Sequence, residues 1–153
     1  MKTSQDVIEE DLEYICENLS DEFAKLCGKH LLITGGAGFL GHYLVQSILH
    51  WNEKAREARS IRLTIYDNYI RGVPSWLTKF QGNKNLILTK YDITLPLPPD
   101  IDEFQYIIHA ASIASPTYYR KHPIKTMDAN VNGLRSLLEY CRQQKEKGKP
   151  VEG

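Results

Sequence analysis

Three glycines that follow a short apolar run are the residues of this sequence best suited to chemistry. Residues 31–33 are all apolar, which predicts a strand buried on both faces. Gly35, Gly38 and Gly41 follow at intervals of three, and apolar residues then recur at helical spacing. Glycines let the backbone of such a turn approach a pyrophosphate closely, and the N-terminus of the next helix favours its negative charge. The pattern therefore predicts a dinucleotide site at a strand-to-helix turn.

The glycine string permits two parses. One is Gly36-x-Gly38-x-x-Gly41, and the other is Gly35-x-x-Gly38-x-x-Gly41 preceded by Thr34, which we favour. The alternative to a binding site is a turn whose glycines serve only the backbone. The strand and the helix on either side favour the site, because a dinucleotide loop requires both of them.

An acid ends the second predicted strand. Apolar and polar side chains alternate over residues 61–66, and Asp67 comes directly after them. In a dinucleotide fold, a carboxylate at this position accepts hydrogen bonds from the adenosine ribose hydroxyls and repels a 2′-phosphate. Asp67 therefore favours NAD over NADP, whereas Arg71 nearby could accommodate the extra phosphate of NADP. A capping role for Asp67 in its turn is the structural alternative.

The composition limits the chain to one globular unit. It has 153 residues, of which 42% are hydrophobic and 25% charged, and this length supports one core. Its 19 basic and 19 acidic residues cancel, so no overall field attracts nucleic acid or an anionic membrane, and we expect neither partner. Apolar runs are too short to span a bilayer and the N-terminus is acidic, so we expect a cytoplasmic protein.

The three cysteines carry no recognisable motif. Cys16, Cys27 and Cys141 are odd in number, far apart in the sequence and within predicted helices. They are therefore expected to be reduced packing thiols. We expect no disulfide, no catalytic cysteine and no metal site.

The first 28 residues form a predicted helical extension that precedes the nucleotide fold. Residues 4–19 place apolar side chains on one helical face, with acids opposite and in the first turns. Ser20 or Asp21 can cap a second short helix, which Gly28 ends. We therefore divide the chain into an extension, 1–28, and a Rossmann domain, 29–153. The extension could contact a partner, or it could pack as an arm over its own sheet.

The remaining pattern alternates strands and helices. The charged residues 52–60 are expected to be solvated surface, residues 74–80 a short helix, and residues 86–88 and 104–109 two further strands. A helix is expected from Pro123 to about Gln144, with Tyr118 lying before it, and Val151 would open a fifth strand. This order predicts an α/β fold, a Rossmann-type doubly wound parallel sheet that ends after its fourth strand and helix.

The motifs resemble those of the extended short-chain dehydrogenase/reductase family, which contains sugar-nucleotide epimerases, dehydratases and decarboxylases. The strings TGGAGFLG, DNYIRG and TKYDIT resemble three of its cofactor segments. Residues 109–126 resemble its UDP-glucuronate decarboxylase branch through Ala-Ser-Pro at 114–116, Tyr119 and Pro-Ile-Lys-Thr at 123–126. Ala110 and Ile113 depart from that branch, which leaves the substrate open.

The resemblance implies roles for individual residues. Asn68 and Tyr69 would wrap the adenosine, Asp92 would lie near the adenine amino group and Ile93 on its ring, and residues 110–112 would line the nicotinamide ribose. Asn130 would support the cofactor side of the site, and His109 is expected to be structural. The implied cofactor-binding residues are Gly35, Gly38, Phe39, Leu40, Gly41, Asp67, Asn68, Tyr69, Asp92, Ile93, Ala110, Ala111, Ser112 and Asn130. The implied substrate-side residues are Ser115, Pro116 and Tyr119.

The family's catalytic pair is missing from these 153 residues. Members use a tyrosine as general base and a lysine four residues later, but no tyrosine here has a lysine at that distance. We therefore expect the N-terminal, cofactor-binding half of an enzyme, inactive alone, with no catalytic residue within it. The resemblance implies NAD as cofactor, a nucleotide-sugar substrate in the complete enzyme and a homodimer formed through the helix at 123–145.

Three functions stay open at this point. The first is a UDP-glucuronate decarboxylase-like enzyme, which oxidises C4, decarboxylates and reduces again. The second is a sugar-nucleotide 4,6-dehydratase or 4-epimerase, which shares the first and last steps. The third is of another class, a dinucleotide-binding or regulatory module without catalysis, and it is motivated by the missing tyrosine and lysine.

Overall fold

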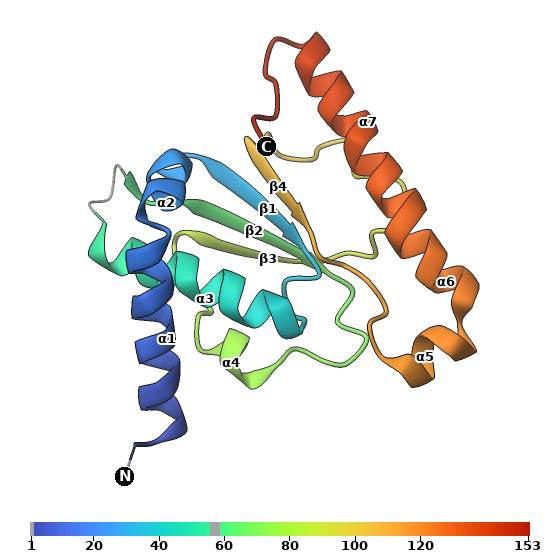
Figure 1. Cartoon of the computed structure of the whole chain (residues 1–153). Helices are drawn as coiled ribbons and strands as arrows, with labels where there is room; N and C mark the ends of the chain where they lie inside the picture. Colours follow the sequence, from blue (N-terminus) through green and yellow to red (C-terminus); the bar gives the residue numbers. More distant parts are fainter. Residues whose placement is uncertain (1, 56–58) are drawn as a thin grey trace.

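The computed structural model describes residues 2–55 and 59–153 and shows a parallel sheet between two layers of helices (Figure 1). The four strands are β1 (His30–Thr34), β2 (Arg62–Asp67), β3 (Leu86–Lys90) and β4 (Tyr106–His109). They lie side by side in the order β3-β2-β1-β4, and every neighbouring pair is parallel. This confirms the predicted Rossmann-type fold, in which the ligand end is the carboxyl end of the strands.

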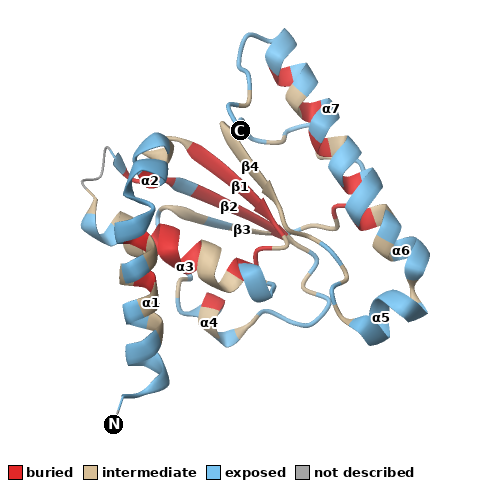
Figure 2. Ribbon diagram, viewed as in Figure 1, coloured by how far each residue is buried: buried red, intermediate tan, exposed pale blue. Residues whose placement is uncertain are grey.

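Four helices cover one face of the sheet. These are α1 (Ser4–Asn18), α2 (Ser20–Leu26), α3 (Phe39–Lys54) and α4 (Ser75–Thr78). Leu31, Ile33, Leu63 and Ile65 pack here in one buried cluster with residues of all four helices. Burial is densest in β1 and β2 and on the inner side of α3 (Figure 2). The continuous apolar run of β1 is explained by this arrangement, because both of its faces are covered.

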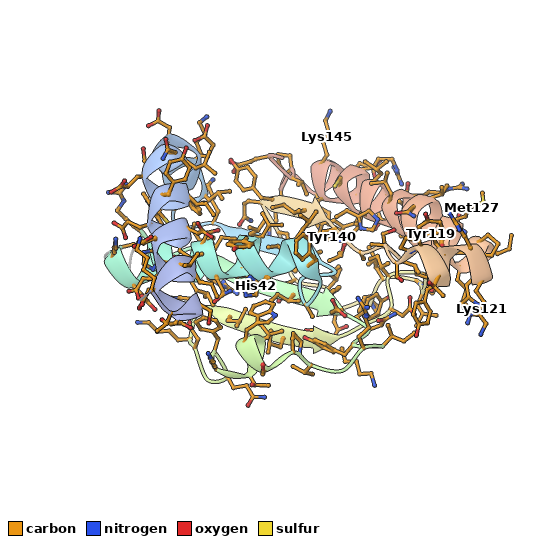
Figure 3. The ribbon with its side chains drawn as sticks, turned by 60° about the horizontal axis from the view of Figure 1, so that its bottom comes forward. His42, Tyr119, Lys121, Met127, Tyr140 and Lys145 are labelled. Carbon is orange, nitrogen blue, oxygen red and sulfur yellow. The ribbon has the colours of Figure 1, made fainter. Side chains whose placement is uncertain are left out.

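One long helical segment covers the other face. It consists of α6 (Pro123–Met127), a π-helical turn η2 (Asp128–Asn132) and α7 (Gly133–Glu146). Tyr140 of α7 lies against the sheet, whereas Lys145 points away from it (Figure 3). The Tyr140 hydroxyl accepts a hydrogen bond from the Phe104 N–H and donates one to the Asp102 carbonyl, both at 2.9 Å. This hydroxyl therefore fixes α7 to the chain that enters β4.

Three details differ from the sequence-based expectations. Tyr118 does not precede the helices but lies in a short one, α5 (Pro116–Lys121), because proline suits a first helical turn and the Ser115 carbonyl accepts the N–H of Tyr118 at 3.0 Å. The helix expected from Pro123 is interrupted by η2. Residues 151–153 form no strand, although the Ile107 N–H donates to the Gly153 carbonyl at 2.9 Å, which keeps this segment beside β4.

The N-terminal extension packs on the helix layer of its own chain. A capping box between Thr3 and Asp6 begins α1, and α1 crosses α3 (Figure 1). The Tyr43 hydroxyl donates to Asp11 at 3.0 Å, and the Cys16 thiol donates to the Ser47 carbonyl at 3.4 Å. Of the two roles expected for residues 1–28, a contact with a partner or an arm packed over the rest of the chain, these contacts agree with the second.

Other expectations concern segments without a motif. Of the charged stretch 52–60, residues 56–58 lie outside the described residues. Within the described residues, no helix has the length and apolar character needed to cross a bilayer.

The three cysteines are free thiols, and burial raises the pKa of Cys16 and of Cys141.

A histidine is buried at the amino end of β1. His30 is 4% exposed, and its Nε2 lies 2.8 Å from the Thr64 hydroxyl of β2. Its ring centroid is 4.5 Å from that of Phe104. Burial, followed by the nearby charge of Arg62, lowers the pKa of His30 below its ordinary 6.5. The folded protein therefore resists protonation at a site that the unfolded chain protonates freely.

We expect His30 to make the protein less stable as the pH falls below about 6.5, because protons then bind the unfolded chain first. Above that pH both states are neutral at this residue, so its penalty is absent. Urea unfolding at about pH 7.5 and about pH 5.5 measures the loss, and His30→Phe should reduce it. Thr64→Val, which keeps the titrating ring, should lower stability at both pH values without reducing the loss. An equal loss in His30→Phe and the wild type would contradict this assignment.

Candidate functional site

The glycine loop lies where β1 and β4 converge at their carboxyl ends. Gly35 has φ of +72°, and a Cβ there would lie 2.6 Å from the Cα of Ala111, at the end of β4. A Cβ on Gly41 would lie 2.1 Å from the carbonyl oxygen of Gly36. Since backbone atoms cannot move aside cheaply, both positions require glycine. A Cβ on Gly36 would also lie 2.7 Å from the Ile65 side chain, so the positive φ and the backbone contact of Gly35 are what favour the parse that begins there. The loop forms a backbone-lined cradle at the edge of the sheet.

The first turn of α3 presents free donors beside this cradle. Gly38 is the N-cap and offers no side-chain acceptor. In the part of the chain that the structure describes, the N–H groups of Phe39, Leu40 and Gly41 have no hydrogen-bond acceptor, whereas the next one, of His42, donates to Gly38. The Phe39 and Leu40 side chains are 86% and 66% exposed. Three unpaired donors and the positive end of a helix dipole form an anion site.

Asp67 joins the glycine loop to the end of β2. Its Oδ2 accepts a hydrogen bond from the Ala37 N–H at 3.0 Å, and its Oδ1 accepts one from the Tyr69 N–H at 2.8 Å. The second bond holds Tyr69 at φ of +50°, a conformation that is uncommon outside glycine. Each carboxylate oxygen keeps a further lone pair. Asp67 can therefore accept hydroxyl hydrogens from a ribose without losing its hold on the loop.

Beyond Asp67, the ends of β2 and β3 border a hollow of about 430 Å³. Asp92 accepts hydrogen bonds from the Thr94 N–H at 3.0 Å, from its hydroxyl at 2.8 Å and from the Asn68 amide at 3.4 Å. Burial raises the pKa of Asp92, but these hydrogen bonds together hold it below its ordinary value. The carboxylate is thus an acceptor for an amino group. The hollow is lined by Asn68, Ile70, Lys90, Tyr91 and Asp92.

The Ile93 side chain lies in the core rather than at this hollow. It is 5% exposed, and it packs so closely on α7 that a Cβ on Gly133 would lie 3.2 Å from its Cγ atoms. This contact accounts for a glycine at the start of α7. Burial assigns the side chain a packing role, so that only the main chain of Ile93 remains for a ligand.

The main chain after β4 is fixed by Thr34. The Ala110 N–H donates to the Thr34 carbonyl at 3.0 Å, and the Ala111 N–H donates to its hydroxyl at 3.4 Å. The same hydroxyl lies 2.7 Å from Nδ1 of His109. Ser112 follows as an exposed residue. Ala110 and Ala111 therefore lie against the glycine loop. The contribution of Thr34 was missed, because its pairing with His109 depends on the register of β1 and β4, which only the structure shows.

The remaining predicted residues are more peripheral. Asn130 lies in η2, where its amide donates to the Thr126 carbonyl of the same helix at 2.9 Å. Ser115 and Pro116 begin α5, and Tyr119 is 37% exposed on it (Figure 3). Within the described residues, no hydrogen bond joins these four to the glycine loop or to Asp67. The structure brings the glycine loop, Asp67 and residues 110–111 together, whereas Asn130 lies in η2 and the predicted substrate-side residues lie on the short helix α5.

The cradle has the chemistry that a dinucleotide requires. Free N–H groups and closely approaching backbone suit the pyrophosphate, Asp67 suits a ribose, and Asp92 suits the adenine amino group. These groups follow one another along the carboxyl edge of the sheet in the order α3, β2, β3. The residues present therefore fit such a ligand.

Comparison with known proteins agrees with this geometry. The chain is 37% identical to UDP-glucuronic acid decarboxylase 6 of Arabidopsis thaliana over 113 residues, which are 74% of this chain and 30% of that protein. It is 34% identical to UDP-glucuronic acid decarboxylase 1 of Danio rerio over 115 residues, which are 75% of this chain and 25% of that protein. The chain thus spans about a third or less of the length of these curated relatives.

Solved structures share the fold. An epimerase from Methanothermobacter thermautotrophicus matches with a TM-score of 0.62 at 23% identity, over 84% of this chain and 36% of that one. A dTDP-glucose 4,6-dehydratase from Streptomyces venezuelae, solved with NAD bound, matches with a TM-score of 0.60 at 22% identity, over 72% and 34%. The model of the NAD dependent epimerase/dehydratase family matches residues 31–150, most of the chain. The chain belongs to this family, which confirms the resemblance seen in its motifs.

Proposed function

We propose that this chain is the NAD-binding portion of a sugar-nucleotide-modifying enzyme of the UDP-glucuronate decarboxylase type. The observation that carries the proposal is the cradle itself, three unpaired N–H groups at the start of α3 beside two positions where only glycine fits. The first turn of any α-helix leaves N–H groups unpaired, so the argument rests on their combination with a glycine loop whose bare backbone lies beside the ends of β1 and β4. The family's NAD dependence and the decarboxylases among its relatives supply the rest of the argument.

Each part of the cradle has one task in this proposal. The first turn of α3 binds the pyrophosphate, and Asp67 accepts the adenosine ribose hydroxyls and repels a 2′-phosphate. Asp92 accepts from the adenine amino group, and residues 110–112 lie along the nicotinamide ribose. NAD, when bound, supplies the acceptor and then the donor of a hydride. The side chains of this chain bind and orient, and none of them is assigned proton transfer.

The proposed reaction begins at C4 of the sugar. The hydrogen on C4 leaves as hydride and the C4 hydroxyl loses its proton, which gives a ketone beside the carbon that bears the carboxylate. Such a β-keto acid loses carbon dioxide, and the carbon that carried the carboxylate takes up a proton. Return of the hydride to C4 and of a proton to the oxygen restores the alcohol, so no net oxidation occurs. Residues 109–126 favour this branch through their sequence pattern. The solved structures that share the fold include a UDP-galactose 4-epimerase and a dTDP-glucose 4,6-dehydratase. Enzymes of these two kinds would share the first step, loss of hydride from C4, and the last, return of the hydride.

A function of another class is favoured by one observation. No tyrosine in the 153 residues has a lysine four positions later, so the chain holds no general base of the expected kind. A dinucleotide-binding or regulatory module needs none. The two functions share the cradle, and they differ in whether the protein that carries this chain turns over a nucleotide sugar. The cytoplasmic location also stays a prediction.

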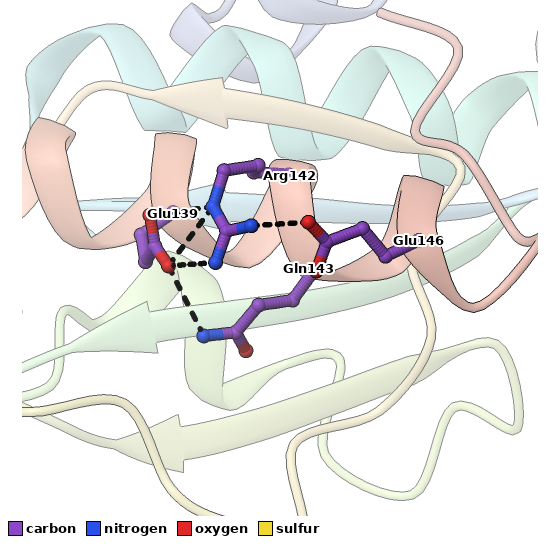
Figure 4. Close-up of polar contacts among 4 residues, drawn as sticks. All are labelled: Glu139, Arg142, Gln143 and Glu146. Atoms are coloured by element: carbon purple, nitrogen blue, oxygen red, sulfur yellow. Dashed lines mark hydrogen bonds and ion pairs between the residues drawn. The ribbon is translucent and has the colours of Figure 1, made fainter.

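The exposed face of the α6–α7 segment supports a homodimer. Its apolar stripe is Ile124, Met127, Val131, Leu134 and Leu138, with side chains between 41% and 68% exposed. On α7, Arg142 pairs with Glu139 at 2.6 Å and with Glu146 (Figure 4). Opposite charges that satisfy each other leave the apolar stripe as the part of this face still to be covered. We propose that a second copy of the chain covers it.

NAD should raise the stability of this chain, because it binds only the folded state. At about 100 times its Kd the gain should be roughly 2.7 kcal/mol, read from the thermal midpoint. Asp67→Asn removes an acceptor and the charge, so we expect an affinity about tenfold weaker and a smaller preference for NAD over NADP. Asp100→Asn, on the exposed proline-rich connector, is the matched control and should behave as wild type. No shift of the midpoint in the wild type would exclude the cradle as an NAD site.

The whole protein that carries this chain should release carbon dioxide from UDP-glucuronate and yield a UDP-pentose, with NAD required but not consumed. Release of label from UDP-glucuronate with a labelled carboxylate measures the carbon dioxide, and mass spectrometry identifies the UDP-pentose. UDP-galactose and dTDP-glucose test the epimerase and the dehydratase in parallel. Turnover of either of those alone would replace the decarboxylase, and NAD binding without turnover of any would favour the module.

Leu138→Lys should weaken the proposed dimer, because it places a charge at the C-terminal end of the apolar stripe. Sedimentation equilibrium of the purified chain measures the shift from dimer to monomer. Gln143→Lys introduces the same charge at an exposed position of α7 that lies about 140° around the helix axis from Leu138, and so it should leave the dimer intact. A wild-type chain that is monomeric at all concentrations tested would contradict the proposal.

A further inference from the structure

A line of hydrogen bonds crosses the carboxyl end of the sheet behind the cofactor cradle. Thr34 ends β1 and His109 ends β4, and the two are register partners. The Thr34 hydroxyl lies 2.7 Å from Nδ1 of His109, and Nε2 of the same ring lies 3.1 Å from the carbonyl oxygen of Ala129 in η2. Thr34 is fully buried and Ala129 is 8% exposed. Water therefore competes little for these groups.

Which group donates in each of these hydrogen bonds follows from the carbonyl of Ala129. A carbonyl oxygen only accepts, so the hydrogen of the neutral imidazole must sit on Nε2 and point at Ala129. Nδ1 is then an acceptor, and the Thr34 hydroxyl must donate to it. The hydroxyl oxygen in turn accepts from the Ala111 N–H at 3.4 Å. One tautomer of His109 thus satisfies every group, from the main chain after β4 to the π-helical turn.

Both ends of the line lie at features that matter for the site. Ala111 is the residue whose Cα would lie 2.6 Å from a Cβ on Gly35. Ala129 belongs to η2, a π-helical turn of a kind that is rare and frequently found at functional sites. The Gly133 N–H donates to the Asp128 carbonyl within this turn, and regular strand pairing ends at His109. The line supplies an additional hydrogen bond to each.

We propose that His109 is a positioning residue, which in its neutral Nε2–H tautomer holds η2 against the end of β4 and so fixes the main chain of residues 110–112. It acts through Thr34 and Ala129 and touches no ligand. The proposal rests on the proposed function only where NAD is the readout. The tautomer and the anchoring of η2 stand without it.

The chain contains its own control for this arrangement. At the opposite end of the sheet, Nε2 of His30 lies 2.8 Å from the Thr64 hydroxyl, a buried histidine–threonine pair between β1 and β2. Breaking it should cost stability much as breaking the Thr34–His109 pair does. It has no connection to η2 or to the cradle, so a purely structural loss is separated from a loss of positioning.

The first test needs no ligand. In ¹⁵N-labelled protein at neutral pH, long-range ¹H–¹⁵N spectra should show His109 as the Nε2–H tautomer. Amide hydrogen exchange should be faster at residues 129–133 in Thr34→Val and His109→Phe, with the strands unchanged. Thr34→Ser should restore protection, and Thr64→Val should leave this turn protected. The Nδ1–H tautomer, or equal exchange in Thr34→Val and Thr64→Val, would overturn the proposal.

The second test measures NAD affinity by calorimetry. Thr34→Val and His109→Phe should each weaken binding about tenfold, the double variant little more than either alone, and Thr34→Ser should bind within about twofold of wild type. Thr64→Val should bind as wild type. Wild-type affinity in Thr34→Val would refute positioning by His109. An absence of NAD binding in the wild type would instead refute the proposed function, and the spectra would still decide the tautomer.

Discussion

The close approach of two backbone segments is the constraint on which the rest of this structure depends. At Gly35 the end of β1 comes so near the end of β4 that a Cβ would lie 2.6 Å from the Cα of Ala111. Because this spacing admits no side chain, the chain must leave β1 in a left-handed turn, and α3 must begin within a few residues. The loop is then held from the other side by Asp67, which accepts the Ala37 N–H. The place of the free N–H groups of α3, beside the ends of β1 and β4, thus follows from how the strands meet.

The buried polar pairs of the sheet fix how neighbouring strands align more than they add to the net free energy of folding. A neutral buried hydrogen bond contributes about 1 kcal/mol, whereas a buried partner left unpaired costs about 1–3 kcal/mol. Such an imbalance penalises every alternative arrangement of the strand ends. His30 with Thr64 fixes β1 against β2 at one end of the sheet, and Thr34 with His109 fixes β1 against β4 at the other. Two threonines and two histidines therefore specify the register that apolar side chains alone would specify weakly.

The fold, the glycine loop and the acid at the end of β2 were predictable because they depend on local spacing. The roles of the other cofactor residues came from the resemblance to the family, and they stay predictions. The period of the apolar residues fixed β1 and α3, and Asp67 was identified by its place at a strand end. Contacts that arise only in three dimensions were not predictable in the same way. Ile93 follows β3 by three residues, and only the packing of α7 shows that its side chain is buried under Gly133. The π turn of η2 carries no composition signal, and the bond between Thr34 and His109 depends on register, which connection lengths do not reveal.

The turn η2 links two surfaces that would otherwise be independent. Ala129 accepts the hydrogen bond of His109 on its inner side, and Val131, two residues on, is 57% exposed in the apolar stripe. A π turn has an alternative in the ordinary α-helical path, which would rotate the residues that follow it. Cover on the stripe and a cofactor along residues 110–112 would then bias the same local equilibrium. Under the proposed dimer and the proposed cofactor site, each would by linkage change the affinity of the other by the same factor. Such coupling would pass through this turn and would require no contact between the two sites.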